Sequence, residues 1–224
     1  YDVETTSAWL RQMTGPDTVV AILQNGVEHL DRFAPFVPSS QLLPVVVNVP
    51  SHRLEPGRIL QLGQAELTVP NSANGQRFAN LFADTQVHVH LTDDFATAAW
   101  AKLALNATGA VTAVTLLPRL DLRQAATEAL VRQIVAEVIE VGSAEGALFG
   151  PDLVEYIVAK LAVSTSTHTN SLHADRLAGK RMEIDARNGA VVRLGAKHAI
   201  PTPVNAVLVD LLRTIESTQD AQRS

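Results

Sequence analysis

The sequence predicts an α/β domain followed by an all-α domain, and three observations lead to this fold class. Up to about Leu91, short β-branched or alternating runs are separated by Gly, Pro and Asn. From Thr92 onward, apolar residues recur at three- and four-residue steps over long stretches, as on one face of a helix. A chain of 224 residues has room for two small domains, and we place the boundary between residues 92 and 93.

The first part is predicted to alternate helices with strands. Residues 18–23 form a β-branched apolar run that is typical of a buried strand, and Gln24-Asn25-Gly26 ends it with residues that tolerate positive φ. Residues 86–91 alternate strictly, which is typical of a half-exposed strand. We expect helices at 5–13, 28–36 and 75–83, and strands at 18–23, 43–49, 86–91 and, as a short pair around Gly63, within 58–69.

The second part is predicted to be helical throughout. Asp93 or Asp94 can cap a first long helix, which Pro118 ends. Residues 164–170 are rich in Ser and Thr and are predicted to form a loop, and the polar tail from Glu216 is predicted to fray. We expect helices at 94–117, 121–148, 153–163, 174–198 and 204–215.

Composition excludes several function classes. The net charge of −5 and the absence of Lys/Arg clusters argue against nucleic-acid binding. Without cysteine there is no disulfide and no thiolate chemistry. No apolar run approaches the roughly 18–20 residues needed to span a bilayer, and no export signal opens the chain, so we expect a cytoplasmic protein that binds no membrane.

Familiar catalytic motifs are also missing. The sequence has no G-x-S-x-G elbow and no G-x-G-x-x-G or G-x-x-x-x-G-K-[ST] phosphate loop. His88 and His90 share one face of a predicted strand, but two ligands are too few for a metal site. We therefore predict no metal.

The first long helix carries a conspicuous charge. Lys102 and Asn106 are four residues apart and project from the same face, and Lys102 is the only charged residue between Thr97 and Thr115. Desolvation in such a helix would lower the pKa of the lysine and make it a usable general acid. The alternative is a surface lysine whose stem packs on the helix while its ammonium reaches water.

Four further residues are candidates. Glu183 lies within the predicted helix 174–198 and can orient a substrate hydroxyl or pair with Lys102. Gly189, costly inside a helix, suggests that another backbone or a ligand comes close. Ser171 follows the Ser/Thr loop and can bind a carboxylate, and Asn25 follows the carboxyl end of a strand, where α/β proteins bind ligands. The alternatives are a solvated carboxylate at Glu183 and a simple capping or loop serine at Ser171.

Taken in order along the chain, these segments resemble the ketopantoate reductase family. Each motif is weak alone, but together, at family-like spacing over nearly the whole chain, they are fairly specific. The matching segments are Tyr1-Asp2, Leu23-Gln24-Asn25-Gly26-Val27, Glu55-Pro56-Gly57-Arg58, Trp100-Ala101-Lys102-Leu103-Ala104-Leu105-Asn106, the stretch from Ser171 to Gly189, and Ile200-Pro201-Thr202-Pro203-Val204-Asn205.

The resemblance implies a fold and a site. The fold is the remnant of a Rossmann-type cofactor domain followed by a helical domain of the 6-phosphogluconate-dehydrogenase-like type, with NADPH and a small 2-keto acid as ligands; a homodimer stays open. Lys102 matches the catalytic lysine that protonates the ketone oxygen, and Glu183 an acidic residue at the substrate. Asn106 and Ser171 match substrate-binding residues, and Asn25 an asparagine at the cofactor. The implied reaction is the reduction of 2-dehydropantoate to pantoate in pantothenate biosynthesis.

The chain also departs from the family pattern. Ala110 and His168 stand where asparagines are common, which leaves another branched 2-keto acid open as substrate. The chain opens in the middle of the pattern, so we expect a truncated sequence with roughly 70 residues, including the glycine loop, before Tyr1.

Two alternatives remain at this point. A chain without its cofactor loop can be a non-catalytic helical dimerisation or interaction module, and a G-x-G-x-x-G upstream of Tyr1 would separate this from the enzyme. A related hydroxy-acid dehydrogenase with another substrate would be separated by profiling several keto acids.

Overall fold

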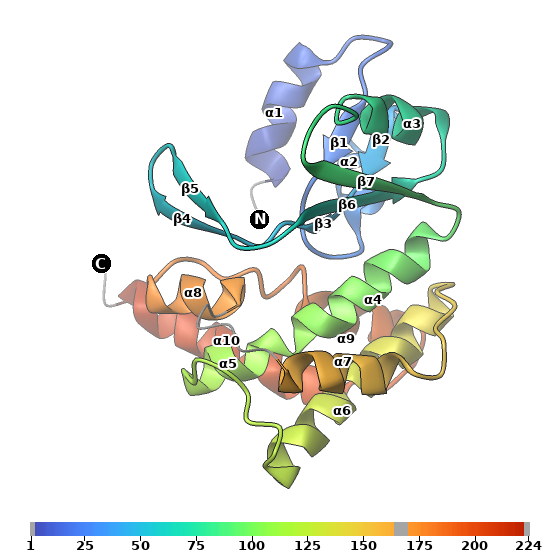
Figure 1. The fold of residues 1–224 in the computed structure, drawn as a ribbon. Helices are drawn as coiled ribbons and strands as arrows, with labels where there is room; N and C mark the ends of the chain where they lie inside the picture. The colour runs from blue at the N-terminus through green and yellow to red at the C-terminus, as the bar shows by residue number, and fades with distance from the viewer. Residues whose placement is uncertain (1–2, 164–169, 222–224) are drawn as a thin grey trace. The chain divides into compact units, whose positions relative to one another are not determined.

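The computed structural model describes residues 3–163 and 170–221 and divides the chain into two units, residues 1–98 and 99–224 (Figure 1). Most of the predicted loop 164–170, including His168, lies outside the described residues. Among the helices that the structure describes, none combines the length and the apolar character needed to cross a membrane.

The first unit mixes helices with short strands. Its elements, in chain order, are α1 (Val3–Met13), β1 (Val20–Ile22), α2 (His29–Phe33), a 3-10 turn (Ser39–Gln41), β2 (Leu42–Pro44), β3 (Val46–Asn48), β4 (Ser51–Glu55), β5 (Arg58–Gln61), β6 (Ala65–Pro70), α3 (Ala73–Asn80) and β7 (Val87–Thr92). This confirms the predicted alternation. β1 and α2 are shorter than expected, whereas α1 begins earlier, at Val3.

The predicted strand 43–49 is divided between two sheets. β2 pairs with β1 in parallel, whereas β3 pairs antiparallel to β6, which in turn runs parallel to β7. Between β2 and β3 lies Val45, fully buried, whose amide still donates to the Ile22 carbonyl at 3.2 Å. Pro44 has no amide hydrogen to donate and so cannot extend a ladder on both sides, which explains the division.

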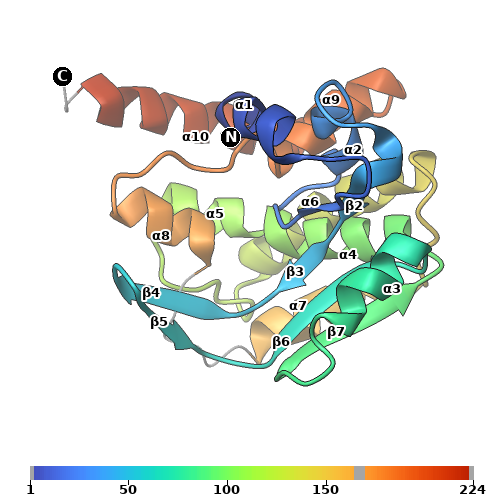
Figure 2. The ribbon, with the colours of Figure 1, turned by 90° about the horizontal axis from the view of Figure 1, so that it is seen from above.

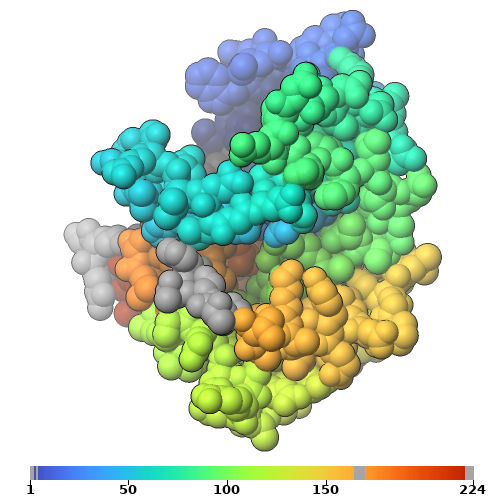
Figure 3. Space-filling model, in the orientation of Figure 1, coloured from blue at the N-terminus to red at the C-terminus, as the bar shows by residue number. Residues whose placement is uncertain are grey.

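The short strands expected around Gly63 are β5 and β6, whereas β4 was not predicted. β4 and β5 form a hairpin that is exposed along its whole length and projects from the rest of the first unit (Figures 1 and 3). Its turn is the Glu55–Arg58 segment, where Gly57 has φ +80°. The strand pattern was missed because an exposed strand has no buried face to impose alternation on apolar residues.

Two hydrophobic clusters hold the first unit together. Phe78 of α3 packs against Leu43, Val45, Leu67 and Val69, so α3 covers one face of the β3-β6-β7 sheet (Figure 2). The second cluster joins β1 and β2 to α2 through Ile22, Leu42 and Phe33. His88 and His90 are both exposed on β7, which confirms the predicted half-exposed strand.

The second unit is all helical, as predicted (Figure 1). Its elements are the greater part of α4 (Phe95–Ala107), then α5 (Gly109–Thr115), α6 (Ala125–Ala144), α7 (Leu153–Ala162), α8 (Ser171–Leu177), α9 (Asn188–Lys197) and α10 (Pro203–Ala221). Ile134, Val138 and Val141 of α6 are fully buried, as their helical spacing predicts, and Val131 is buried beside them. Leu148, which was placed on the same face, lies beyond the end of α6 and is exposed.

Four predicted helix extents in this unit are wrong. The helix predicted at 121–148 is shorter at both ends, since α6 spans Ala125–Ala144. The helix 94–117 is interrupted at Thr108, whose hydroxyl donates to the Leu105 carbonyl and draws the backbone away from regular α-helix. The helix 174–198 is interrupted from Ala178 to Arg187. The tail does not fray at Glu216, because α10 continues to Ala221.

Candidate functional site

Helix α4 positions Lys102 and Asn106. The Asp94 carboxylate accepts a hydrogen bond from the Thr97 amide at 3.0 Å and so caps the start of the helix. Trp100, Leu103, Ala104 and Ala107 are buried on α4, whereas Lys102 and Asn106 are half-buried. The helix thus anchors itself with apolar residues and leaves one polar pair at the margin of the core.

The electrostatic surroundings of Lys102 weaken its hold on a proton. Burial lowers the pKa of the Lys102 ammonium most, and the positive charges of Lys160 and Arg187 lower it further. Lys160 is exposed on α7, whereas Arg187 is buried. The lysine is therefore a better proton donor than an ordinary surface lysine.

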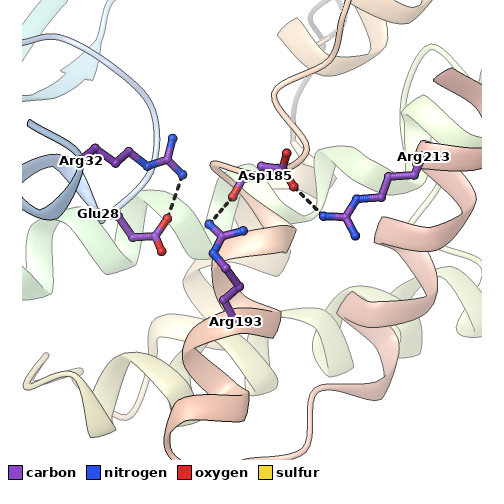
Figure 4. A network of polar contacts seen from close by, with 5 residues as sticks. All are labelled: Glu28, Arg32, Asp185, Arg193 and Arg213. Atoms are coloured by element: carbon purple, nitrogen blue, oxygen red, sulfur yellow. Dashed lines mark hydrogen bonds and ion pairs between the residues drawn. The ribbon is translucent and has the colours of Figure 1, made fainter. Parts of the chain in front are cut away.

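The interruption between α8 and α9 places Glu183 in a turn rather than on a helix. Met182 and Ile184 are buried and anchor this turn, and the Met182 amide donates to the Glu216 carboxylate of α10 at 2.7 Å. Asp185 lies between two arginines (Figure 4): its carbonyl accepts from Arg193 and its carboxylate from Arg213. Apolar residues whose spacing in the sequence is typical of a helix therefore anchor a turn here.

Gly189 has the close backbone approach that was predicted for it, although it lies in the first turn of α9 and not inside a helix. A Cβ at this position would lie 3.0 Å from the Ile184 carbonyl oxygen. The Gly189 amide donates to the same oxygen at 3.0 Å. Glycine therefore lets the turn that carries Glu183 fold tightly onto the start of α9.

Arg187 joins Ser171 and Glu183. Its side chain is only 3% exposed, and its Nη2 donates to the Ser171 hydroxyl at 2.5 Å and to the Glu183 carboxylate at 3.1 Å. Ser171 itself is exposed, and the Glu183 side chain is 28% exposed. A buried cation thus supports two polar groups that solvent can reach.

A network of buried polar side chains links α6 and α10 to the end of α4. The Glu137 carboxylate accepts from the Val204 and Asn205 amides and from the Asn205 side chain, at 2.8, 2.9 and 2.6 Å. Asn188 donates to Asn205 at 2.8 Å and to the Ala107 carbonyl at 3.1 Å. The chain of contacts therefore runs from α6 to the residue that follows Asn106.

Asn170 ties α8 to α5. Its amide nitrogen donates to the Thr112 hydroxyl at 2.6 Å, and its oxygen accepts from the His173 amide at 3.1 Å, which caps α8 directly before Ser171. A Cβ on Gly109 would lie only 2.9 Å from the Asn170 oxygen. α8 accordingly lies beside α5 (Figures 1 and 2), with Ser171 at its start.

Asn25 belongs to the first unit. It lies in the turn that follows β1, beside Gly26 at φ +108°, and is half-buried. The buried His29 contacts the Gln24 carbonyl at 2.8 Å, and Glu28 pairs with Arg32 at 2.8 Å (Figure 4). These contacts fix both flanks of the turn.

Within the second unit, the structure brings Ser171 and Glu183 onto one arginine and places that arginine within electrostatic reach of Lys102. Asn106 shares the Lys102 face of α4 by its four-residue spacing. The sequence reasoning missed Arg187. Its position four residues after Glu183 was a weak signal, which the assumption of a continuous helix obscured. The roles of the five predicted residues stay predictions.

Family models match most of the chain. The model described as "Ketopantoate reductase PanE/ApbA" matches residues 1–74, and the one described as "Ketopantoate reductase PanE/ApbA C terminal" matches residues 94–216. The two matches together include every candidate residue named above.

Named relatives agree with the family models. The chain is 45% identical over 212 residues to the 2-dehydropantoate 2-reductase of Caulobacter vibrioides, covering 95% of this chain and 73% of that protein. It is 36% identical over 204 residues to the enzyme of the same name from Mycobacterium tuberculosis, covering 91% of this chain and 69% of that protein.

Solved structures share the fold. The PanE/ApbA family ketopantoate reductase from Ralstonia eutropha is 32% identical, with a TM-score of 0.88, covering 98% of this chain and 74% of that one. A D-mandelate dehydrogenase solved with NADH and anilino(oxo)acetate has a TM-score of 0.90 at 22% identity, covering 98% and 74%, and shows likeness of fold alone. From its sequence and its fold, the chain belongs to the ketopantoate reductase family.

Proposed function

We propose that this protein reduces 2-dehydropantoate to pantoate, a step of pantothenate biosynthesis, with NADPH as the hydride donor. The observation that carries the proposal is Lys102, a half-buried ammonium with a lowered pKa on the same helix as Asn106, in a chain of the ketopantoate reductase family. The shared name of the Caulobacter and Mycobacterium relatives supports this substrate.

In this proposal, residues 1–92 are the C-terminal portion of the dinucleotide-binding domain, and residues 93–224 are the substrate domain. The turn after β1 fits the reactive end of a nicotinamide cofactor, because Gly26 at φ +108° turns the chain sharply and Asn25 offers both a donor and an acceptor. The nicotinamide, when bound, supplies a hydride to C2 of the keto acid.

The residues of the second unit complete the reaction. The Lys102 ammonium gives its proton to the ketone oxygen as C2 accepts the hydride, so that the ketone becomes a hydroxyl and the lysine is left neutral until water reprotonates it. Asn106 donates to the same oxygen, and Ser171 holds the carboxylate. Glu183 accepts a hydrogen bond from the terminal hydroxyl of the substrate.

The family resemblance supports three further assignments: NADPH rather than NADH as reductant, a cytoplasmic location, and a homodimer. Cofactor preference follows from comparing kcat/KM for the two nucleotides. Light scattering on the purified protein gives the oligomeric state.

Replacement of Lys102 by alanine tests the proposal. We expect kcat for 2-dehydropantoate reduction by the full natural chain to fall by at least about 100-fold, the usual contribution of a general acid. Loss of absorbance of the reduced nicotinamide measures the rate, and circular dichroism checks the fold. The matched control is Lys180→Ala, an exposed lysine of the same unit, which should keep wild-type turnover.

Two outcomes would contradict the proposal. Unchanged turnover in Lys102→Ala would remove the assigned acid. A wild-type protein that reduces other 2-keto acids but not 2-dehydropantoate would keep the chemistry and reject the substrate.

A further inference from the structure

We propose that Arg187 is a positioning residue that assigns opposite hydrogen-bonding roles to Ser171 and Glu183, making the first a donor to the substrate carboxylate and the second an acceptor for the substrate hydroxyl. The inference rests on the proposed function and adds a determinant of substrate choice. It concerns a residue that the sequence did not point to.

The position of Arg187 suits an indirect role. Its side chain is 3% exposed, so it lies beneath Ser171 and Glu183 and does not face solvent itself. A single nitrogen, Nη2, donates to both groups, at 2.5 and 3.1 Å. The guanidinium is a planar donor without any acceptor capacity, so both partners must accept from it.

This constraint orients the Ser171 hydroxyl. A hydroxyl that accepts from a cation keeps its own hydrogen for donation, and the neighbouring positive charge polarises that O–H bond. Ser171 is exposed, so its hydrogen is available to a ligand. The group therefore favours an anionic oxygen such as a carboxylate over a neutral ester or amide.

The same contact keeps Glu183 an acceptor. The guanidinium can only donate, so the Glu183 oxygen that it contacts at 3.1 Å accepts. The second Glu183 oxygen can then accept from a ligand hydroxyl. A substrate with a carboxylate at one end and a hydroxyl at the other matches this donor–acceptor pair.

Arg187 is poorly satisfied as a purely structural residue. Its Nε is buried and has no hydrogen-bond partner among the described residues. Its positive charge also repels the Lys102 ammonium and lowers the pKa of that group. A buried arginine that serves stability alone is expected to use all its donors and to avoid a like charge. Here its hydrogen bonds go instead to Ser171 and Glu183, the two side chains that solvent reaches.

Two substitutions and three substrates test the inference in the full natural chain. Arg187→Met keeps the size and removes the charge, whereas Arg187→Lys keeps the charge and removes the planar fork. The substrates are 2-dehydropantoate, its analogue without the terminal hydroxyl, and the methyl ester of that analogue. The first comparison measures selection of the hydroxyl, and the second measures selection of the carboxylate.

We expect wild type to prefer the hydroxylated acid over the analogue, and the acid over the ester. In Arg187→Met both preferences in kcat/KM should fall by about tenfold or more, the scale of discrimination by a buried polar site. Addition of Ser171→Ala to Arg187→Met should then cost little more, because the serine has already lost its orientation. The alkaline limb of the kcat profile should move to higher pH in Arg187→Met and stay near its wild-type position in Arg187→Lys.

Other results would overturn the inference. An equal loss for all three substrates, with an unmoved alkaline limb, would mean that Arg187 serves only stability. If Arg187→Met does not fold, Arg187→Lys with unchanged selectivity and fully additive effects of Ser171→Ala would lead to the same rejection. Failure of the proposed function is distinguishable, because wild type itself would then not reduce 2-dehydropantoate, whatever its rates with the two analogues.

Discussion

At the scale of single residues, the proposed chemistry depends on the surroundings of Lys102. The buried residues of its helix are all apolar, and the positive charges of Lys160 and Arg187 lower the pKa of its ammonium beyond the effect of burial. Burial and like charge act in the same direction, so the ammonium releases its proton more readily than a solvated lysine. An anionic substrate would relieve the repulsion when it binds.

The lowered pKa gives a prediction about pH. A general acid works only while protonated, so activity is present below the pKa of Lys102 and is lost as the pH rises through it. Because that pKa is lowered, the alkaline limb of kcat should lie at lower pH than an ordinary lysine would give. Lys160→Gln removes a positive neighbour, raises the pKa of Lys102 and should move the limb upward.

The measurement is a pH profile of kcat for wild type, for Lys160→Gln and for Lys180→Gln as control. Lys160 lies on α7 with its ammonium 5.5 Å from the centre of the Tyr156 ring, so its loss should disturb little else. A limb that does not move in Lys160→Gln would contradict the electrostatic account of Lys102.

At the scale of elements, the second unit is held by a carboxylate at the start of a helix. Glu137 of α6 accepts two backbone amides of α10, which neutralises donors that a helix start leaves unpaired and places a negative charge at the positive end of the helix dipole. Through Asn205 and Asn188 the same group supports the end of α4.

Glu137→Ala should therefore destabilise the protein by about 3 kcal/mol, because it leaves buried donors without an acceptor. Urea denaturation followed by circular dichroism measures the change. The control is Glu140→Ala, an exposed glutamate on the same helix, for which we expect a change within about 0.5 kcal/mol. Equal effects of the two substitutions would reject the structural role of Glu137.

Helices and strands were predicted best where burial of one face sets both the spacing of apolar residues and the local structure. The buried face of α6 and the half-exposed β7 follow directly from their periods. The predicted helix 174–198 was wrong because Met182 and Ile184 are buried to anchor a turn. The spacing of apolar residues cannot distinguish such anchors from the buried face of a helix. The end of α10 was wrong because Glu216 finds its partner, the Met182 amide, far away in the sequence.

The candidate site, too, could be predicted only in part. The common face of Lys102 and Asn106 follows from helix spacing, and the close approach at Gly189 from the cost of glycine in a helix. Arg187 could not be assigned, because its burial and its contact with Ser171 exist only in the folded unit.

At the scale of the whole molecule, one helix joins the two units. α4 begins in the first unit and continues into the second, since the division falls between Ala98 and Ala99. Asn25 lies in the first unit, whereas Lys102 lies in the second, together with Arg187 and its two partners, Ser171 and Glu183. The proposed reaction therefore requires residues of both units.

Insertion of one alanine between Ala98 and Ala99 tests this requirement. A single residue turns a helix by about 100° and lengthens it by about 1.5 Å, so Lys102 and Asn106 would be rotated relative to the start of α4. We expect reductase activity to fall to background while circular dichroism remains helical. An alanine inserted between Pro118 and Arg119, in an exposed loop, should leave activity intact. Full activity after the first insertion would mean that the proposed reaction does not depend on the register of α4.

The contact between Glu216 and the Met182 amide has a practical consequence for anyone who handles the protein. Glu216 of α10 holds the segment that carries Glu183, so a carboxypeptidase that removes Glu216 itself would leave the Met182 amide without this acceptor and loosen that segment. Affinity tags and crystallisation truncations are accordingly safest when they leave everything up to that glutamate in place.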